Sequence, residues 1–306
     1  MNKKAAIIIV NWNSYNYTFQ CINSINQTNN HEFDIIVVDN NSEDGSGIQL
    51  KEAFNNIVLI QSDKNTGFAG GNNLGIRYAI DHGYEYSFML NNDTVVPQNF
   101  LSPLIEYMES HTGIGMIQPK IYFNHDRSLL WNGGSYYNHF LGLTYTSNHF
   151  FSFFKNIERI KKVDWVTGCA FLAKNSVLEE VGYFDEKFFM YYEDVDLSFR
   201  IKKAGHTLIY HPASVVYHEA GASLKKKVKT REGYLNPYVH YLNARNKIYF
   251  LRKHTAVYYL PGVIVFSFLH SVAFIGYFVA RGRFSKLNSF LKGLKDGLFE
   301  KKTNLN

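Results

Sequence analysis

Cysteine is scarce in this sequence, whose 306 residues contain only Cys21 and Cys169. Both lie in apolar stretches and fit neither a metal site nor a disulfide framework, so a reducing cytoplasm is the expected compartment. A secretory signal peptide is not recognisable, because the first four residues lead directly into a strand-like run. We find no internal repeat and no low-complexity tract, and the 46% hydrophobic content argues against wholesale disorder.

Acidic residues are rare in the last part of the chain. From Gly221 onward there are 16 Lys and Arg against 3 acidic residues, which gives this stretch a charge of +13. Because the whole chain carries +6, residues 1–220 carry 6 − 13 = −7. The asymmetry indicates different partners for the two parts, and the basic part suits nucleic acid or an anionic membrane surface.

The first half of the sequence alternates short apolar runs with helix-length segments. Strands are predicted at Ala5–Val10, Asp34–Asp39, Ile57–Ile60 and Tyr86–Leu90. Helices are predicted at Tyr15–Gln27, Ser46–Asn55, Gly71–His82 and from Pro97 to about Ser110. This alternation favours an α/β fold with a mostly parallel central sheet covered on both faces. We expect one domain over residues 1–220 and a basic, helical region over residues 221–306.

The middle of the sequence is less regular. Residues 120–160 are rich in aromatic side chains and Asn, and they indicate a variable loop or hairpin region. A strand is expected at Val163–Phe171 and a short helix at Asn175–Val181. The acidic cluster Glu193–Asp196 then opens a helix that ends at Ala204-Gly205.

Polar residues end three of the predicted strands. Asn11, Asp39 and the segment Asn91–Asp93 all fall at carboxyl ends, where open α/β sheets bind ligands. Asp39 could accept hydrogen bonds from a base or ribose, or it could serve an Asx turn and helix cap. Asp93 is the better metal ligand, since Mg²⁺ and Mn²⁺ prefer carboxylate oxygen, and an ordinary turn is the alternative.

A glycine-rich segment, Asn65–Gly75, surrounds the start of the third predicted helix. We expect a turn whose glycines let the backbone approach an anion at the helix N-terminus. The segment matches neither a Walker A loop nor the G-x-G-x-x-G spacing, so a structural turn explains it about as well.

The second acidic cluster offers a catalytic base. Capping of the helix start is the alternative role for all its acids, because the helix dipole stabilises negative charge there. Asp196 can pair with Arg200 four residues later, whereas Asp194 has no such obvious partner and is our choice of general base. His218 follows another strand-like run and could complete a metal shell, although a lone histidine is more commonly structural.

The longest uncharged stretch is Ala256–Ala280, which is long enough to span a bilayer. However, Lys and Arg crowd both flanks, which opposes the positive-inside tendency for a single span. Pro261-Gly262 and Gly276 also interrupt the stretch. We therefore expect a re-entrant or interface-lying helical hairpin at an anionic membrane surface, with a buried helix in a soluble dimer as the alternative.

Taken in chain order, these segments resemble the family 2 glycosyltransferases of the GT-A fold, most closely the bacterial rhamnosyltransferase-like branch. The matching segments are Ile9–Asn13, Val37–Ser42, Asn65–Gly75, Leu90–Thr94, Gly168–Phe171, Gly182–Arg200 and Val216–His218. The tail segments Ala244–Lys247 and Gly293–Gly297 also look like the C-terminal region of such enzymes.

The resemblance implies an inverting transfer of a sugar, rhamnose being one candidate, from a nucleotide diphosphate sugar (dTDP- or UDP-linked) to a glycan hydroxyl. Asp93 and His218 would hold Mg²⁺ or Mn²⁺, and Asp194 would be the base beside Glu193. The other implied donor-site residues are Asn11, Asp39, Asn72, Asn91, Asn92 and Trp165, the last lining the sugar or acceptor pocket. The Asn91-Asn92-Asp93 segment departs from the usual two aspartates, which leaves the strength and identity of the metal open.

The resemblance also bears on the acceptor and the location. The chain lacks the Gln-x-x-Arg-Trp motif and the several spans of processive synthases, so single additions are expected. A polyprenyl-diphosphate-linked glycan of a surface polysaccharide, at the cytoplasmic face of the cell membrane, would suit the apolar tail. A non-catalytic nucleotide-binding protein is the alternative. A nucleic-acid-binding protein is less favoured, because the 25-residue uncharged stretch has no cations to follow phosphates.

Overall fold

The computed structural model describes residues 4–29, 33–148, 156–219, 225–230 and 232–299. The chain forms two compact units. The first comprises residues 1–136, 145–189 and 193–220, and the second comprises residues 137–144, 190–192 and 221–306. The second unit therefore takes in three residues that directly precede the acidic cluster.

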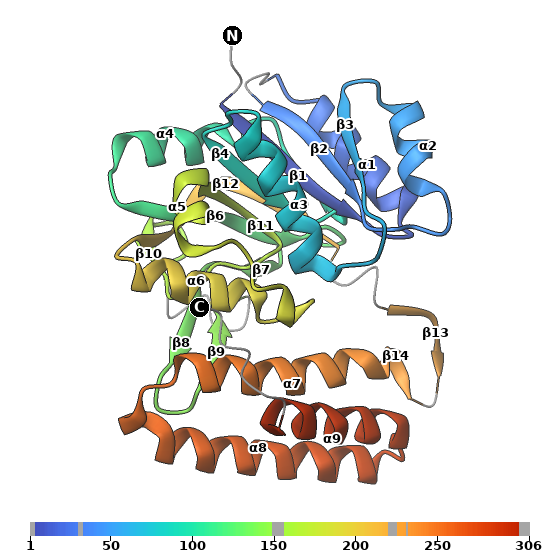
Figure 1. The fold of residues 1–306 in the computed structure, drawn as a ribbon, viewed down its shortest axis with the longest axis vertical. Coiled ribbons are helices and arrows are strands. Elements are labelled where there is room, and N and C mark those ends of the chain that lie inside the picture. Colours follow the sequence, from blue (N-terminus) through green and yellow to red (C-terminus); the bar gives the residue numbers. More distant parts are fainter. Residues whose placement is uncertain (1–3, 30–32, 149–155, 220–224, 231, 300–306) are drawn as a thin grey trace. The chain divides into compact units, whose positions relative to one another are not determined.

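The first unit is built on a twisted, mostly parallel sheet with helices on both faces (Figure 1). Its first half contains strands β1 (Ala5–Asn11), β2 (Phe33–Asp39), β3 (Ile57–Gln61) and β4 (Tyr86–Leu90), all mutually parallel where they pair. The helices between them are α1 (Tyr15–Asn26), α2 (Ser46–Ala53) and α3 (Gly67–Asp81). These elements lie close to the predicted positions.

The second half of this unit extends the same sheet. Its strands are β5 (Thr94–Val95), β6 (Ile114–Phe123), β7 (Leu130–Asn132), β10 (Lys161–Lys162), β11 (Ala170–Lys174) and β12 (Thr207–His218). Strand β11 runs antiparallel between β4 and β6, and β12 pairs in parallel with β6. The helices are α4 (Ser102–Ser110), α5 (Asn175–Val181), the short η2 (Glu186–Phe188) and α6 (Glu193–Lys203). Strands β8 (Ser135–Asn138) and β9 (Leu143–Thr146) form a hairpin whose residues 137–144 belong to the second unit. This hairpin confirms the expectation for residues 120–160 in part; residues 149–155 lie outside the described chain.

Alternating side chains of the central strands enter two separate cores. Ile7 and Val37 pack on the face covered by α1, α2 and α4, while Ile8 and Val38 pack on the face covered by α3, α5 and α6. Burial on both faces explains why these strands read as nearly continuous apolar runs. Polar side chains are consequently confined to the strand ends and to specific buried contacts.

The glycine-rich turn is shorter than predicted, because helix α3 begins at Gly67 instead of Gly71. Gly71 and Gly75 lie inside the helix, as expected, and face the sheet. A Cβ atom on Gly75 would lie 2.4 Å from Cγ2 of Ile8, and one on Gly71 would lie 2.8 Å from Cγ1 of Val10. The glycines therefore allow close contact between the helix and β1.

Two further predictions about local structure are wrong. Helix α4 begins at Ser102 rather than at Pro97, because Phe100 and Leu101 are buried in the core first and Pro103 supplies the proline of the helix start. The strand expected at Val163–Phe171 begins only at Ala170. Val163 and Asp164 still donate to backbone carbonyls of other strands, but the next N–H groups donate to side chains: Val166 to Ser198, Thr167 to Gln118 and Gly168 to Asp194.

The second unit is mainly helical. It contains the small strands β13 (Lys225–Thr230) and β14 (Gly233–Leu235), then α7 (Pro237–His254), η4 (Val257–Tyr259), α8 (Leu260–Ala280) and α9 (Phe284–Phe299). Helices α7 and α9 pack closely through two glycines. A Cβ on Gly293 would lie 2.4 Å from the carbonyl oxygen of Tyr241, and one on Gly297 would lie 2.9 Å from that of Arg245. The two tail segments noted in the sequence thus lie against each other.

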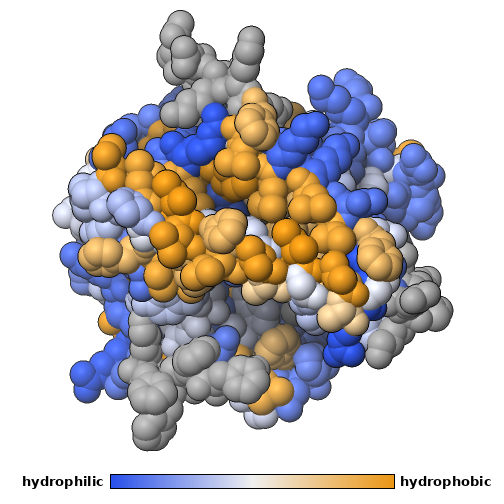
Figure 2. All heavy atoms as spheres, turned by 90° about the horizontal axis from the view of Figure 1, so that it is seen from below, coloured by the Kyte–Doolittle hydropathy of each residue, from blue (hydrophilic) through white to orange (hydrophobic). Residues whose placement is uncertain are grey.

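Helix α8 is continuous, which corrects the expectation that Pro261-Gly262 and Gly276 interrupt it. Pro261 lies in the first turn, where its missing N–H removes no helical hydrogen bond, and Gly276 has no atom within 4 Å of the position a Cβ would take. By length and composition, Val257–Ala280 could cross a membrane, and only 11% of its most apolar window is buried. Figure 2 shows many hydrophobic side chains on the surface seen from below. The exposed hydrophobic residues of α8 include Ile264, Val265, Phe268, Leu269, Val272 and Val279.

Candidate active site

The carboxyl edge of the sheet gathers the polar residues predicted from the sequence. Asn11 and Asp39 are direct partners in the parallel register of β1 and β2. The Asn91–Asp93 segment follows β4, which is the other neighbour of β1. Three adjacent strand ends therefore meet at one edge, as the alternating strands and helices predicted.

Asp39 is buried at this edge and is held by hydrogen bonds. Its Oδ1 accepts from Nδ2 of Asn11 at 2.9 Å and from Oγ of Ser42 at 2.5 Å. The same amide of Asn11 donates to Oγ of Ser46 at 2.8 Å. Gly47 lies directly against the carboxylate, because a Cβ there would be 2.5 Å from Cγ of Asp39. Asp39 therefore makes the turn contact with Ser42 that the sequence suggested, and it also lies at the strand end where a ligand is expected.

A buried hydrogen-bond chain joins Asp39 to the Asn91–Asp93 segment. Nδ2 of Asn92 donates to Oγ1 of Thr18 at 2.9 Å, and this hydroxyl donates to Oδ1 of Asn11 at 2.7 Å. Asn11 then donates to Asp39. Since Thr18 and Asn11 are fully buried, this chain fixes one strand end relative to the other. Sequence reasoning missed Thr18, although a polar residue on the apolar face of α1 was the available signal.

Asp93 and His218 form the candidate metal site. The antiparallel pairing of β5 with β12, which places His218 opposite Thr94, brings them together. Nε2 of His218 lies 3.1 Å from Oδ1 of Asp93, at ion-pair distance but off line for a hydrogen bond. Burial alone would lower the pKa of His218, but the neighbouring Cys169 and Asp93 raise it to about 10.

These two residues fit a divalent cation as part of a larger ligand set. Neither ring nitrogen of His218 has a hydrogen-bond partner in the described chain, so a nitrogen lone pair could bind a cation once the imidazole has lost its proton. Within the described ranges, no group of three or more His, Cys, Asp or Glu side chains is placed to hold a metal. A cation here would need oxygen ligands from a bound diphosphate or from water.

Asp194 is connected to the carboxyl edge of the sheet by a few hydrogen bonds. Its Oδ2 accepts from the N–H of Gly168 at 2.8 Å, and its Oδ1 accepts from the N–H of Val195 at 2.8 Å. The carbonyl of the next residue, Cys169, accepts from the N–H of Asn91 at 2.8 Å. Asp194 therefore has backbone partners that the sequence did not reveal, and they tie it to the Asn91–Asp93 segment.

The electrostatics of the acidic cluster separate its members. Burial raises the pKa of Asp194 to about 6, against the opposing effect of the N–H groups of Gly168 and Val195. Burial and the adjacent charge of Asp194 raise the pKa of Glu193 well above its usual range, and Oε2 of Glu193 has no partner within the described residues. A carboxylate that ionises near neutral pH suits a general base.

Asp196 has the structural role expected of it. Its Oδ2 lies 2.7 Å from Nε of Arg200, as the four-residue spacing predicted. The guanidinium also donates to the carbonyls of Val181 and Tyr183, both at 2.6 Å. This ion pair anchors α6 to the loop after α5.

Two candidate donor-site residues direct their polar groups into the protein. The side chain of Asn72 donates to the carbonyl of Phe68 in its own helix at 2.9 Å. The indole N–H of Trp165 donates to the carbonyl of Tyr136 at 3.0 Å, and its backbone bridges to Ser135. Both side chains are largely buried, so any contact with a substrate would involve other atoms.

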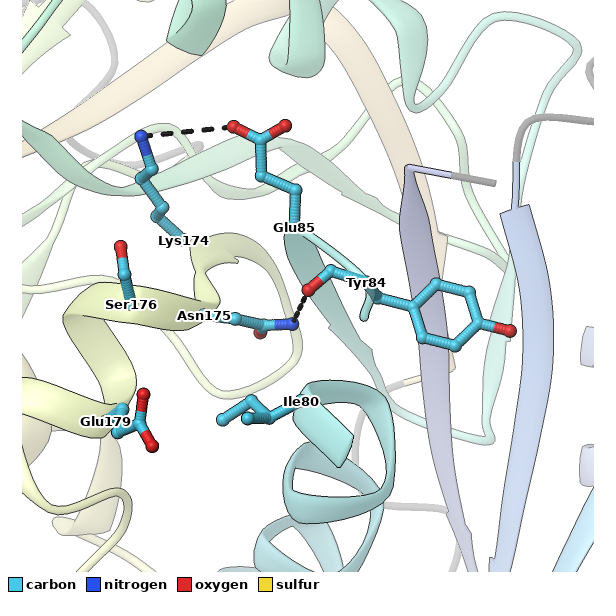
Figure 3. Close-up of a pocket in the computed structure, with 7 residues that line it drawn as sticks. All are labelled: Ile80, Tyr84, Glu85, Lys174, Asn175, Ser176 and Glu179. Atoms are coloured by element: carbon cyan, nitrogen blue, oxygen red, sulfur yellow. Dashed lines mark hydrogen bonds and ion pairs between the residues drawn. The ribbon is translucent and has the colours of Figure 1, made fainter. Parts of the chain in front are cut away.

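A small hollow of about 250 Å³ lies at the opposite end of β4 (Figure 3). Glu85 and Lys174 face each other across it at 3.9 Å, and Nδ2 of Asn175 donates to the carbonyl of Tyr84. Because this hollow adjoins the amino end of β4, it is separate from the carboxyl edge that carries Asp39, Asp93 and Asp194.

The sheet order and the polar residues at its carboxyl edge are those of an α/β fold with a candidate ligand site at its strand ends. The sequence matches Glycosyl transferase family 2 over residues 6–182, more than half of the chain, and the protein belongs to that family. Its resemblance to the rhamnosyltransferase-like branch is confirmed by the relatives described next.

Relatives of this chain include several named glycosyltransferases. A low-salt glycan biosynthesis hexosyltransferase of Haloferax volcanii is 29% identical over 65% of this chain and 61% of its own length. The rhamnosyltransferase WbbL of Escherichia coli K12 is 27% identical over 70% of this chain and 83% of its own. An N-acetylglucosaminyl-diphospho-decaprenol L-rhamnosyltransferase of Mycobacterium tuberculosis is 46% identical over 20% of each chain. The match thus covers less than two thirds of the first and last of these proteins.

Solved structures confirm the fold. A mannosyltransferase of Pyrobaculum calidifontis, in complex with GDP-Man and Mn²⁺, superposes with a TM-score of 0.59. The superposition covers 98% of this chain and 88% of that one at 14% sequence identity. At this identity the similarity establishes the GT-A fold and nothing further about ligands.

Proposed function

We propose that the protein transfers a hexosyl group, with rhamnose the favoured sugar, from a nucleoside diphosphate sugar to a hydroxyl of a glycan. The observation that carries this proposal is the meeting of Asp39, the Asp93–His218 pair and Asp194 at one edge of the sheet. The named rhamnosyltransferases among its relatives support the choice of sugar.

In this proposal the donor lies along the carboxyl edge. Asp39 would accept hydrogen bonds from the nucleoside, while Asp93 and His218 would hold Mg²⁺ or Mn²⁺ on the diphosphate. When bound, the cation supplies Lewis-acid stabilisation of the negative charge that develops on the leaving diphosphate. The mannosyltransferase with bound Mn²⁺ supports a divalent metal.

Asp194 would act on the acceptor. Each of its carboxylate oxygens accepts one backbone hydrogen bond and retains capacity for another, so it can take the proton of an acceptor hydroxyl. The acceptor oxygen then forms a bond to the anomeric carbon as the bond from that carbon to the diphosphate oxygen breaks. A single in-line displacement inverts the anomeric configuration. The raised pKa of Glu193 would keep this side chain neutral, so that it adds no second negative charge beside the base.

The same proposal places the enzyme at the cytoplasmic face of the cell membrane with a polyprenyl-diphosphate-linked acceptor. Its support is the decaprenol-linked substrate in the name of one relative and the exposed apolar face of α8. The continuous α8 and amphipathic α9 suggest that the hairpin lies in the membrane interface, with Arg281 and Arg283 near the headgroups.

The first test is a thermal-shift and titration series with dTDP, UDP and GDP, each with and without Mn²⁺ or Mg²⁺. A ligand that binds only the folded state raises the melting temperature. Metal-dependent stabilisation by one nucleotide, lost in Asp93→Ala, is the expected result. NMR of the product formed from the matching nucleotide sugar then gives the anomeric configuration. A well-folded sample that responds to no nucleotide would contradict the proposed function.

A further inference from the structure

The loop before the acidic cluster holds three non-glycine residues in an unfavourable conformation. Phe189, Tyr191 and Tyr192 have φ angles of 63°, 71° and 69°. Residues with a Cβ atom rarely adopt positive φ, and bulky ones do so only where the surroundings hold them. Glu193 and Asp194 follow immediately at the start of α6. The backbone that delivers the proposed base to its place is therefore under local constraint.

One side chain of α7 holds this loop directly. Asn246 is fully buried, and its Nδ2 donates to the carbonyls of Met190 and Tyr191, both at 2.8 Å. Two hydrogen bonds from one amide thus fix two consecutive carbonyls. The carbonyl oxygen of Asn246 accepts from Nε of Arg245 at 2.9 Å, which orients the amide with its donors toward the loop.

The loop is also fixed at its beginning, within the first unit. The carbonyl of Phe189 accepts from the N–H of Ala69 at 3.1 Å. Gly67 allows this contact, because a Cβ atom there would lie 2.4 Å from the same carbonyl oxygen. Phe189 is thus held by the start of α3, whereas Met190 and Tyr191 depend on Asn246.

We propose that Asn246 is a positioning residue for the transfer reaction, holding Met190–Tyr192 so that Asp194 is set for the acceptor hydroxyl. This inference rests on the role of Asp194 in the proposed function. Asn246 acts through Tyr192, the one residue between its carbonyl partner Tyr191 and the acidic cluster.

The two hydrogen bonds from Asn246 to Met190 and Tyr191 form a clamp, and its loss has a defined structural consequence. Without the two hydrogen bonds from Asn246, the peptide units of Tyr191 and Tyr192 are held less firmly and rotate more readily out of the left-handed region. That rotation turns the first residues of α6 and weakens the bond from Gly168 to Asp194. Asp39 and Asp93 are held by contacts of their own: Asp39 accepts from Asn11 and Ser42, and Asp93 pairs with His218. A defect in transfer with intact donor binding is therefore the expected signature.

The kinetic test compares Asn246→Ala with Asn243→Ala in the full chain. Asn243 is a matched control, because its amide donates only within α7, to the carbonyl of Val239 at 2.9 Å. We expect kcat of Asn246→Ala to fall by on the order of 10²-fold, the usual effect of a displacement of about 1 Å at a reacting group. The KM for the donor and the affinity for metal and nucleotide stay at the wild-type values. The acidic limb of the kcat–pH profile moves to higher pH, because Asp194 loses stabilising N–H donors.

Amide hydrogen exchange tests the same inference without any activity. The N–H groups of Gly168 and Val195 both donate to Asp194, so they report whether its carboxylate is in place. In Asn246→Ala these two amides should exchange faster, while the amides of β1 and β2 stay protected and Asn243→Ala matches the wild type. This result would stand even if no donor supported transfer, which separates the failure of this inference from failure of the proposed function.

Three outcomes would overturn the inference: an unchanged kcat, unchanged exchange at Gly168 and Val195, or a uniform rise in exchange together with lost nucleotide binding. The last would mean that Asn246 only supports folding. If Asn246→Ala gives no folded protein, Asn246→Ser replaces it, since its hydroxyl can donate to one carbonyl but not to both. A serine variant equal to the wild type in kcat and exchange would refute the clamp.

Discussion

The buried hydroxyl of Thr18 offers the sharpest test of how the site is built. Its Oγ1 lies between Oδ1 of Asn11 at 2.7 Å and Nδ2 of Asn92 at 2.9 Å, and Thr18 is fully buried. Thr18→Val keeps the shape of the side chain but replaces the hydroxyl with a methyl group. The substitution therefore removes one donor and one acceptor from the centre of the chain that joins Asn92 to Asp39.

The magnitude follows from the groups left without this partner. A buried polar group that loses its hydrogen bond costs about 1–3 kcal/mol. The amide groups of Asn11 and Asn92 both lose a partner, but only Asn11 has no exposed surface. Because water can offset part of the loss at Asn92, we expect the free energy of unfolding to fall by about 2–4 kcal/mol, less than two full penalties. Thr18→Ser keeps both hydrogen bonds and loses only a methyl group, which costs about 1 kcal/mol.

Urea denaturation followed by circular dichroism measures both variants against the wild type. The affinity for nucleotide with and without Mn²⁺, measured by calorimetry, should fall in Thr18→Val and not in Thr18→Ser, because the two strand ends lose their fixed relation. Equal stability of the valine and serine variants, within about 0.5 kcal/mol, would refute the reasoning, since surface-like effects lie in that range.

Three further predictions concern the base, the helix–sheet contact and the apolar face. Asp194→Asn should abolish transfer while leaving nucleotide affinity intact; in the wild type kcat should fall tenfold per pH unit below about 6, because Asp194 with its raised pKa must lose its proton to act as base. A rate independent of pH from 5 to 8 would contradict that role. Gly75→Ala should lower the thermal midpoint by several degrees, because the new Cβ would lie 2.4 Å from Ile8, whereas Gly276→Ala, with open space around it and no positive φ, is the steric control. Leu269→Glu, on the exposed face of α8, should reduce co-sedimentation with anionic vesicles without changing nucleotide affinity in solution; undiminished sedimentation would contradict membrane contact through this face.

Local patterns in the sequence predicted the first half of the sheet and the residues at its edge. β4 begins and ends at the predicted residues, and Asn11 and Asp39 lie side by side as expected. The reason is that strands buried on both faces leave a clear apolar run, and polar residues mark their ends. The Asp196–Arg200 pair was likewise predictable, because both residues lie on one helix.

Contacts between distant segments could not be predicted in this way. The start of α3 depends on how closely Gly71 and Gly75 approach β1, and no local rule distinguishes that from a turn. One hydrogen-bond donor to Asp194 is the N–H of Gly168, 26 residues earlier, where the backbone is not part of the expected strand. Asn246 was noted only as part of a tail segment, since its contacts with Met190 and Tyr191 span more than 50 residues.

The position of Asn246 in the chain has a consequence for biosynthesis. The ribosome synthesises the chain from its N-terminus, so Asp39, Asp93 and His218 emerge before α7 does. Asn246 appears 56 residues after Met190, whose carbonyl it binds. With the proposed clamp, a nascent or prematurely terminated chain that stops before α7 would bind nucleotide sugar but lack a fixed base. Unfinished chains would thus leave their donor unconsumed, and transfer would begin only once the helical tail has been made.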